Sequence, residues 1–538
     1  MNKLILVTFG GSPERAELCL YLNAAAGLYS NCDIYCYPVD KDTGSPNYLN
    51  TRQLYENYTD FRNVVEIDGL ERTYILRSES IFDDMLKKSG INSPQEESIQ
   101  YLMSKLETRS KQEQAQGQRL LDICLTQDDQ LRNMEGGYYG KAHIGSVTGD
   151  ILIHKEIYQS EKFYQEIQRE LKVGNELDVV VVYSSFGGTG ASLGINFGKF
   201  LHESLQQKQN LRLHCINIQP YFCFPEPNEN DKNQTDYKQF KEKSAAVTAI
   251  LAQENKLIRK GEQAGVFDRF YYIGQSALDQ VSDENAPAGN QKNRIHIVDM
   301  LVSLAVWDIL QQKDTPEEKD KDGLQLYAYQ YEAKGTQKIL WRHMPDEFKV
   351  KHIHMMRFCE FMLDCMETLF EEGFEGYRTH RLITHLYGRK GLLSGKADIN
   401  RSDDEKLHQD IHKCIVLCRK YVQYWIQLEE NTRGGSTDES VTSFFNLAEL
   451  KRIAEVKSKE EFAERIKTKN NYTLCEINGK LINGMEGIKK YTCLQIYEML
   501  CASDALDKIA RTEKNVAGVL VKQIYEMSGI DYTGNYRN

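Results

Sequence analysis

One stretch of the sequence, a buried strand that leads directly into a glycine-rich loop and a helix, constrains the fold most. The apolar run over 176–183 contains four consecutive valines and predicts a buried strand. The loop that follows reads SSFGGTGAS over 184–192, and apolar residues at helical spacing continue from 193 to 205. Glycine lets the backbone approach a ligand closely, and a helix start offers unpaired N–H groups with a partial positive charge.

This strand, loop and helix together predict a site for an anion such as phosphate. The predicted binding residues are Gly187, Gly188, Thr189, Gly190, Ala191 and Ser192. The hydroxyl groups of Thr189 and Ser192 would act as additional donors. The alternative is a glycine-rich turn that serves only the close packing of the strand against the helix.

Strand-like and helix-like segments alternate through the first 310 residues. Strands are predicted at 4–8, 33–39, 176–183, 211–218 and 267–273, and helices at 14–28, 193–205, 238–261 and 295–310. Because the strands are nearly continuous apolar runs, the predicted fold class is α/β, with a mostly parallel sheet covered by helices. A largely α-helical C-terminal region is predicted to follow, since four later segments carry helical spacing, at 354–374, 405–428, 447–466 and 495–527.

The domain boundaries follow from changes in composition along the 538 residues. We predict a nucleotide-binding domain over 1–310, with a polar inserted region at about 45–130 that the pattern does not place on the sheet. The charge-dense segment 311–323 is the predicted linker, and 324–538 is the predicted, mainly helical, C-terminal domain.

Two further glycine loops accompany the first. One is Gly10-Gly11-Ser12 after the first strand, and the other lies over 136–146 and includes Gly140 and Gly145. The 184–194 loop lacks the GKS or GKT of a Walker A loop and does not fit the GxGxxG dinucleotide pattern. Three glycine loops at helix starts would converge on one polyphosphate at the carboxyl edge of a parallel sheet.

The GGTG sequence over 187–190, taken with the order of these elements, resembles the tubulin/FtsZ superfamily. The family loop reads GGGTGSG or GGGTGTG, and here Phe186 and Ser192 replace its first and last glycines. The resemblance covers 1–44 and about 132–310. It implies that GTP, with Mg²⁺, is the cofactor. The residues that it adds to the site are Gly10, Gly11, Ser12, Asp40, Gly140, Gly145 and Gln275.

Asp299 has two alternative roles under this resemblance. In one register it falls where the family places a carboxylate that reads guanine. In the other register Asn293-x-x-His296-x-x-Asp299 forms the loop and helix that position water, so that Asn293 and Asp299 would be catalytic. The family's NxDxxD pattern has no clear equivalent after the central helix. Nucleotide binding is therefore better supported by the sequence than GTP hydrolysis, which stays open.

The leading functional hypothesis is a tubulin-like, GTP-binding protein that assembles head to tail with copies of itself into filaments, with possible GTPase activity at the subunit contact. An alternative is a nucleotide-sensing scaffold or regulator that does not hydrolyse, for example in a prokaryotic antiviral defence system, and that binds a partner protein through the C-terminal region. A third alternative is an unrelated enzyme that uses a dinucleotide, although the missing GxGxxG pattern argues against it.

Composition removes several other classes. The 67 basic and 78 acidic residues give a net charge of −11, which argues against a general nucleic-acid coat protein. The longest later apolar stretch, 300–310, is too short to span a bilayer. The 13 cysteines include no CxxC pair, which indicates buried reduced thiols and a cytoplasmic location. The spacing of His352 with His354, and of His380 with His385, does not favour a metal site.

Overall fold

The computed structural model describes most of the chain, and the account below concerns the residues that it describes. They are 2–29, 32–66, 70, 72–82, 98–101, 110–134, 138, 141–152, 162–205, 210–223, 246–247, 267–274, 279–280, 294–311, 325–329, 344–371, 377–390, 395–432, 444–455, 493–506 and 515–529. Most of the predicted helix at 238–261 lies outside these ranges.

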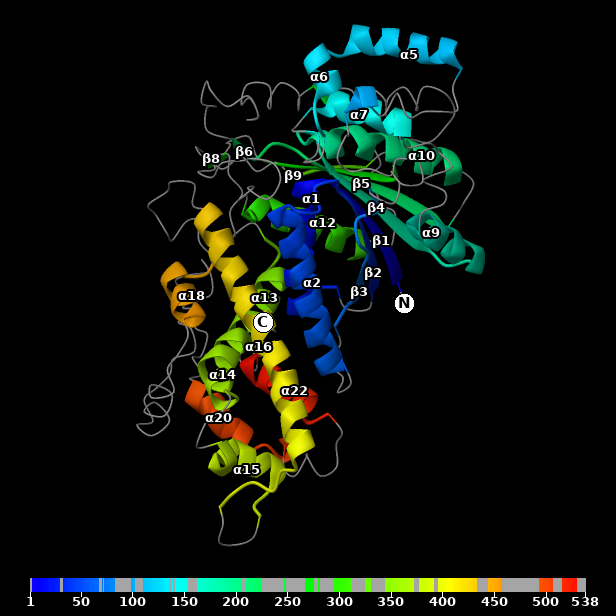
Figure 1. The fold of residues 1–538 in the computed structure, drawn as a ribbon. Coiled ribbons are helices and arrows are strands. Elements are labelled where there is room, and N and C mark those ends of the chain that lie inside the picture. Colours follow the sequence, from blue (N-terminus) through cyan, green and yellow to red (C-terminus); the bar gives the residue numbers. More distant parts are fainter. Residues whose placement is uncertain are drawn as a thin grey trace.

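A seven-stranded sheet forms the centre of the molecule, and neighbouring strands in it run parallel (Figure 1). Its spatial order is β3-β2-β1-β4-β5-β7-β9. The strands are β1 (Asn2–Phe9), β2 (Cys32–Val39), β3 (Tyr74–Arg77), β4 (Leu177–Ser184), β5 (Leu211–Ile218), β7 (Arg269–Ile273) and β9 (Gln325–Tyr329). The prediction of an α/β fold with a parallel sheet is confirmed.

Side chains alternate between two cores, one on each face of the sheet. On β1, Leu4 and Leu6 belong to one core and Ile5 and Val7 to the other. On β4, valines at 180 and 182 and at 179 and 181 divide in the same way. Because both faces are covered, these strands read as continuous apolar runs instead of alternating with polar residues.

Helices of the first half cover both faces of the sheet (Figure 1). One face carries α1 (Gly11–Ala26), α2 (Pro46–Val65) and α12 (Ile297–Gln311). The other carries α7 (Ala142–Leu152), α9 (Lys162–Val173) and α10 (Ile195–Leu205). The helices α5 (Lys111–Cys124) and α6 (Gln127–Leu131) lie beyond α7, and a small separate sheet pairs β6 (Phe222–Cys223) with β8 (Asp279–Gln280).

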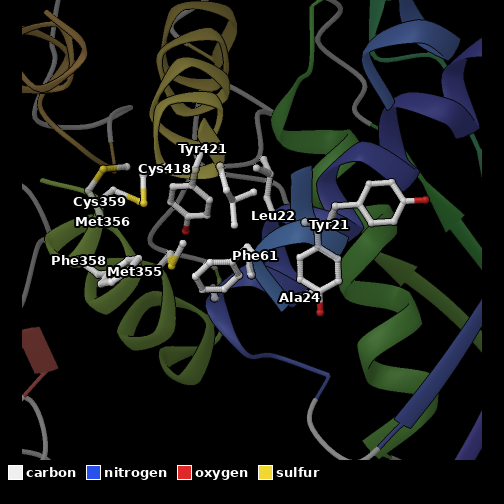
Figure 2. Close-up of a cluster of buried hydrophobic side chains, with 14 of the residues drawn as sticks. Tyr21, Leu22, Ala24, Phe61, Met355, Met356, Phe358, Cys359, Cys418 and Tyr421 are labelled. Carbon is white, nitrogen blue, oxygen red and sulfur yellow. The ribbon is translucent and has the colours of Figure 1, made fainter. Parts of the chain in front are cut away.

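The later helices pack on the face that carries α1 and α2. They are α13 (Asp346–Phe361), η4 (Met362–Met366), α14 (Glu367–Leu369), η5 (Tyr377–Thr379), α15 (Arg381–Tyr387), α16 (Arg401–Thr432), α18 (Leu447–Ala454), α20 (Cys493–Cys501), η6 (Asp504–Leu506) and α22 (Val516–Gly529). Figure 2 shows Leu22 of α1, Phe61 of α2, Met355 of α13 and Tyr421 of α16 in one buried cluster. The apolar core of the sheet face therefore continues into the C-terminal helices.

A buried polar chain crosses this same contact between α1 and the later helices. His352 of α13 bonds to Asn23 of α1 at 2.8 Å and to the Tyr421 hydroxyl of α16 at 2.6 Å. The Asn23 amide donates to Ser303 of α12 at 2.7 Å. Burial lowers the pKa of His352 to about 3, so the ring is neutral and bonds on both nitrogens. His352 is thus engaged with side chains instead of being placed for a metal.

Two elements of the sheet lie where no strand was predicted. The predicted insertion at 45–130 contributes α2 to the core and β3 to the sheet edge. The strand β9 follows the predicted linker directly and pairs with β7. Within the described part of the chain, no helix is both long and apolar enough to cross a bilayer.

Candidate phosphate-binding site

The two central strands mark a reversal in how the sheet is wound. The helix after β1, α1, packs on one face, and the helix after β4, α10, packs on the other. The strands themselves are neighbours, with Phe9 paired to Tyr183 near their carboxyl ends. In open α/β sheets a ligand crevice lies outside the carboxyl ends of the strands at such a switch point. The two glycine loops that follow β1 and β4 are therefore at the position that the topology favours.

The first glycine loop is a single tight turn between β1 and α1. Gly10 has φ +86° and ψ 174°, a conformation open only to glycine without strain, and its N–H donates to the Val39 carbonyl at 3.2 Å. The helix begins at Gly11, so the N–H groups of Gly11 and Ser12 have no acceptor within it. The first turn of α1 thus presents donors at the carboxyl edge.

The second glycine loop lies against the first. After β4 the Ser184 hydroxyl accepts from the Gly187 N–H at 3.2 Å, and the π-helix η2 (Gly190–Gly194) leads into α10. A β-carbon added to Gly10 would lie 3.4 Å from the β-carbon of Thr189. The residues predicted from two separate motifs, Gly10 and Thr189, are therefore in contact, as the convergence of loops requires.

Gly190 of the GGTG sequence, and Gly194 just beyond it, are also needed for packing. A β-carbon on Gly190 would lie 2.8 Å from Ser184 N and 3.0 Å from Phe9 O, both of them backbone atoms. A β-carbon on Gly194 would lie 2.7 Å from the Tyr183 ring. At these two positions, close strand–helix packing is a sufficient reason for glycine. These glycines therefore have a packing role, and the loop still lies at the crevice.

The third glycine loop reaches the second through α7. A β-carbon on Gly145 would lie 3.1 Å from the Gly188 carbonyl oxygen. The Ser192 hydroxyl, which was predicted as a ligand donor, instead donates to that carbonyl at 2.7 Å. Ala191, in η2, is buried. The first half of α7 consequently packs against the start of the Gly188 helix, which itself lies beside the start of α1.

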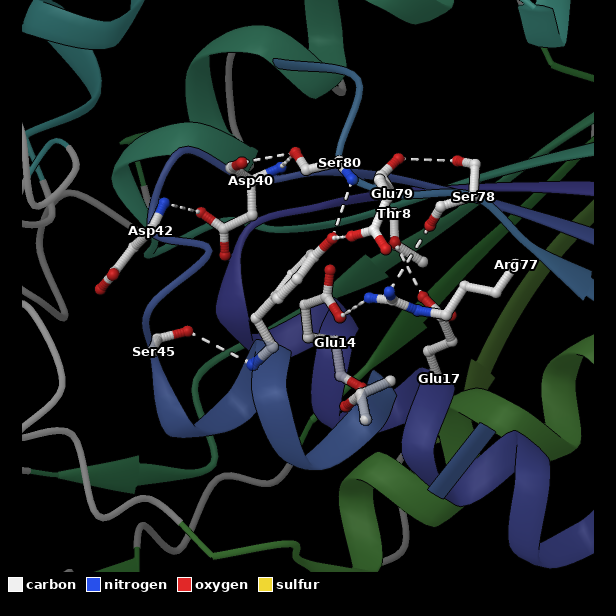
Figure 3. Close-up of polar contacts among 12 residues, drawn as sticks. Thr8, Glu14, Glu17, Asp40, Asp42, Ser45, Arg77, Ser78, Glu79 and Ser80 are labelled. Atoms are coloured by element: carbon white, nitrogen blue, oxygen red, sulfur yellow. Dashed lines mark hydrogen bonds and ion pairs between the residues drawn. The ribbon is translucent and has the colours of Figure 1, made fainter. Parts of the chain in front are cut away.

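Asp40 follows β2 at the same edge and is buried. Its carboxylate accepts from the Asp42 N–H at 3.1 Å, and its own backbone bonds to Ser80 (Figure 3). Burial raises the pKa of Asp40 to about 7. The predicted site residue is therefore a carboxyl group that changes charge near neutral pH.

Asp299, the candidate base reader or catalytic residue, is fully buried in a polar network. Its oxygens accept from Arg15 Nε at 3.3 Å, from the Tyr221 hydroxyl at 2.6 Å and from the His296 N–H at 2.9 Å. The bond to His296 caps the start of α12. Arg15 also donates to Ser12 at 3.1 Å, which ties the network to the first glycine loop. Asp299 thus acts as a brace between α1 and α12.

Phe186, directly before the GGTG sequence, packs among aromatic rings. Its ring centroid lies 6.3 Å from that of Tyr221 and 5.5 Å from that of Phe222. Phe186 therefore fills the space beside Tyr221, a member of the Arg15–Asp299 brace, with an apolar side chain.

A second buried network, missed by the sequence analysis, lies under the first glycine loop (Figure 3). Arg77 of β3 pairs with Glu14 at 2.9 Å and Glu17 at 2.8 Å, and the Thr8 hydroxyl donates to Glu17 at 3.2 Å. Among the residues that the structure describes, one oxygen of Glu14 has no hydrogen-bond partner. Burial raises the pKa of Glu14, Arg77 opposes the shift, and Glu17 and Asp40 add to it. A signal was present in Glu14 and Arg15, charged residues near the start of a helix that is otherwise largely apolar.

The remaining predicted site residues, Gly140, Gln275 and Asn293, lie outside the described residues. Nothing matched this chain in comparisons with protein-family models, curated proteins and solved structures. The functional argument consequently rests on the residues and the geometry given above.

Magnesium ions are held by one or two carboxylates together with ligand phosphates and several waters. Asp40 and the unpartnered oxygen of Glu14 fit that limited role beside the first glycine loop. Within the described residues, no group of three or more His, Cys, Asp or Glu could hold a metal ion by itself. A metal at this edge would therefore depend on phosphate oxygens.

The buried carboxyl of Asp40 predicts a decline in stability as the pH rises towards neutral. Its folded pKa of about 7 exceeds the ordinary value of 3.8, so between these limits the unfolded chain releases a proton that the folded chain keeps. The free energy of unfolding is expected to fall across this range by up to about 4 kcal/mol relative to Asp40→Asn. Urea unfolding of both proteins from pH 4.5 to pH 8 measures the difference, and identical pH slopes would contradict it.

Proposed function

We propose that this chain is a tubulin-like protein that binds GTP, with the phosphates held where the glycine loops meet. One observation carries the proposal, namely the contact of Gly10 with Thr189 across the switch point between β1 and β4. Backbone N–H groups at helix starts bind phosphate through hydrogen bonds and the helix dipole. The overall acidity of the chain does not oppose this, because the donors are local dipoles.

The sheet order supports a nucleotide-binding fold in general, whereas the tubulin-like assignment depends on the position of one glycine loop. The order β3-β2-β1-β4-β5 agrees with the doubly wound arrangement shared by many nucleotide-binding proteins. The GGTG loop after β4, in place of a GxGxxG loop after β1, favours a tubulin-like protein over an enzyme that uses a dinucleotide.

Guanine as the base is proposed from the family resemblance alone. Asp299 is not offered as the group that reads it, since Arg15 and Tyr221 already hold its carboxylate. Mg²⁺, bound near Asp40 and Glu14, would neutralise phosphate charge beside the first glycine loop.

Nucleotide retention tests the glycine-loop site directly. Wild-type protein purified from cells is expected to carry bound GTP or GDP. The variants Gly188→Ala and Thr189→Ala are expected to carry at least tenfold less nucleotide, because both residues line the meeting point of the loops. Mass analysis of the released nucleotide measures the content. Gly44→Ala is the control, since among the described residues a β-carbon there would meet a single side-chain atom, Asp42 Oδ1, at 3.8 Å. Full retention by both loop variants would reject the site.

Head-to-tail assembly into filaments, with possible hydrolysis of GTP at the contact, is the cellular role that the resemblance adds. A contact between two different surfaces repeats without closing and so builds a filament. Sedimentation with GTP and with GDP tests this role. Pelleting that requires GTP is the expected result, and a protein that stays monomeric at high concentration with either nucleotide would reject assembly.

A second candidate function is a nucleotide-sensing scaffold without hydrolysis. The position of Asp299 favours it, because a carboxylate bonded to Arg15 and Tyr221 inside its own chain is not available to a neighbouring subunit. The helix α1 runs from the glycine loop to Asn23, which bonds to His352 of the later helices. Binding of labelled GTP with phosphate release at the background rate would select this candidate over the GTPase.

A further inference from the structure

Lys141 lies directly before α7, one helical turn ahead of Gly145. Gly145 packs on Gly188, as its missing β-carbon shows, and further along α7 a β-carbon on Gly149 would lie 2.6 Å from Leu193. Gly145 thus lies against Gly188 and Gly149 against Leu193, five residues later, so α7 packs on η2 with its own start nearer the glycine loop. One turn rises about 5.4 Å, so Lys141 extends beyond Gly145 towards the edge where the glycine loops meet.

The ammonium group of Lys141 pairs with Asp129 of α6. The Thr126 hydroxyl also donates to Asp129, at 2.8 Å, and His143 Nε2 lies 3.5 Å from it. Although burial opposes ionisation, the hydrogen bonds from Lys141 and Thr126 lower the pKa of Asp129 to about 2. Asp129 is thus a charged partner of Lys141 throughout the physiological pH range.

This ion pair is more exposed than the other pairs described at the same edge. The side chains of Arg15 and Asp299 are 3% and 0% exposed, and those of Arg77 and Glu14 are 2% and 0% exposed. Lys141 is 26% exposed and Asp129 is 9% exposed. Separating a buried pair leaves an uncompensated charge, whereas a more exposed pair contributes little free energy. Of these three cations, Lys141 can change partner most easily.

We propose that Lys141 is a phosphate-binding residue of the glycine-loop site, and that Asp129 competes with the phosphate for its ammonium group. This inference rests on the proposed function and names a cation for a site otherwise built from backbone donors. An ammonium group offers three donors, and a terminal phosphate carries more negative charge than one carboxylate. A bound nucleoside triphosphate therefore draws Lys141 from Asp129, and the strength of that pair sets the affinity.

Equilibrium binding of radiolabelled GTP to four variants tests the competition. Lys141→Ala is expected to weaken binding about tenfold, the loss of one charge-assisted hydrogen bond, and Lys141→Arg to restore most of it. Asp129→Asn is expected to tighten binding about threefold, because Lys141 is then unpaired. Lys3→Ala is the matched control, since Lys3 pairs with Glu170 at 2.7 Å with a 17% exposed side chain, but lies at the start of β1, the opposite edge of the sheet. Its affinity should equal that of the wild type.

The outcomes separate this inference from the proposed function. Wild-type protein that binds GTP, together with unchanged affinity in Lys141→Ala and Asp129→Asn, would overturn the inference and leave the glycine-loop site standing. Wild-type protein that binds no GTP would overturn both. Should Lys141→Ala fail to fold in a thermal melt, Asp129→Asn decides, because damage to the fold would not raise affinity. A weaker salt dependence of binding in Lys141→Ala is the accompanying expectation.

Discussion

Replacing Gly190 with alanine is expected to lower the free energy of unfolding by about 3 kcal/mol, the upper range for overpacking a well-packed interior. The new β-carbon would lie 2.8 Å from Ser184 N and 3.0 Å from Phe9 O. Both are backbone atoms at the ends of β4 and β1, so relief requires the two central strands to move apart. Because this movement opens the contact between the glycine loops, nucleotide retention should be lost as well. Urea unfolding and mass analysis of bound nucleotide measure the two effects.

Gly44→Ala is the matched control for this experiment. Gly44 lies outside the glycine loops and does not have a positive φ, and within the described part of the chain a β-carbon there would meet just the Asp42 side chain, at 3.8 Å. Its free energy of unfolding should stay within about 0.5 kcal/mol of the wild type. Equal urea midpoints for Gly190→Ala and Gly44→Ala would show that the close approach of the second loop to β1 is not needed for stability.

Asp299→Ala is expected to lower the free energy of unfolding by about 4 kcal/mol, the range for removing one partner of a buried ion pair. The substitution leaves Arg15 charged and buried, removes the acceptor of the Tyr221 hydroxyl and uncaps α12 at His296. Urea unfolding again measures the change. Glu56→Ala is the control, because Glu56 and its partner Arg52 are exposed, and it should change stability by no more than about 0.5 kcal/mol.

The conservative variant distinguishes the brace from a base reader. Asp299→Asn keeps the shape of the side chain but loses the charge that Arg15 pairs with, so an intermediate loss of stability is expected. If this variant instead keeps wild-type stability but now prefers a nucleotide with a base other than guanine, Asp299 reads the base and the structural role is wrong.

The central part of the sheet could be predicted because its strands are buried on both faces. The apolar run at 211–218 matches β5 in both bounds, and the valine run locates β4 to within one residue at each end. The strand β3 could not be found in this way, since its four residues alternate in burial and include Arg77. The helix α2 was hidden by its polar outer face, although Leu54, Tyr58 and Phe61 recur at helical spacing on its buried face.

Some residues of the candidate site could likewise be predicted from the sequence, and others could not. Loop residues such as Gly10 and Thr189 could be predicted because glycine and hydroxyl side chains between a strand and a helix have local meaning. The brace of Arg15, Tyr221 and Asp299 could not be predicted. Arg15 and Tyr221 are 206 residues apart in the sequence, and Tyr221 and Asp299 are 78 apart, so they meet only through the packing of α1 and α12. A buried charge has no local signature when its partner comes from a distant element.

The contact between α22, the last described helix, and α2 has a consequence for folding during synthesis. Asn515, just before α22, donates to the Val64 carbonyl at the end of α2, 451 residues earlier. A ribosome that adds about 5 to 20 residues per second needs roughly 20 to 90 s to synthesise that interval. During this time the nascent chain displays a surface of α2 that α22 will later cover. Synthesis rate and chaperone supply should therefore influence the yield of folded protein more than they would for a chain whose early helices pack only on their neighbours.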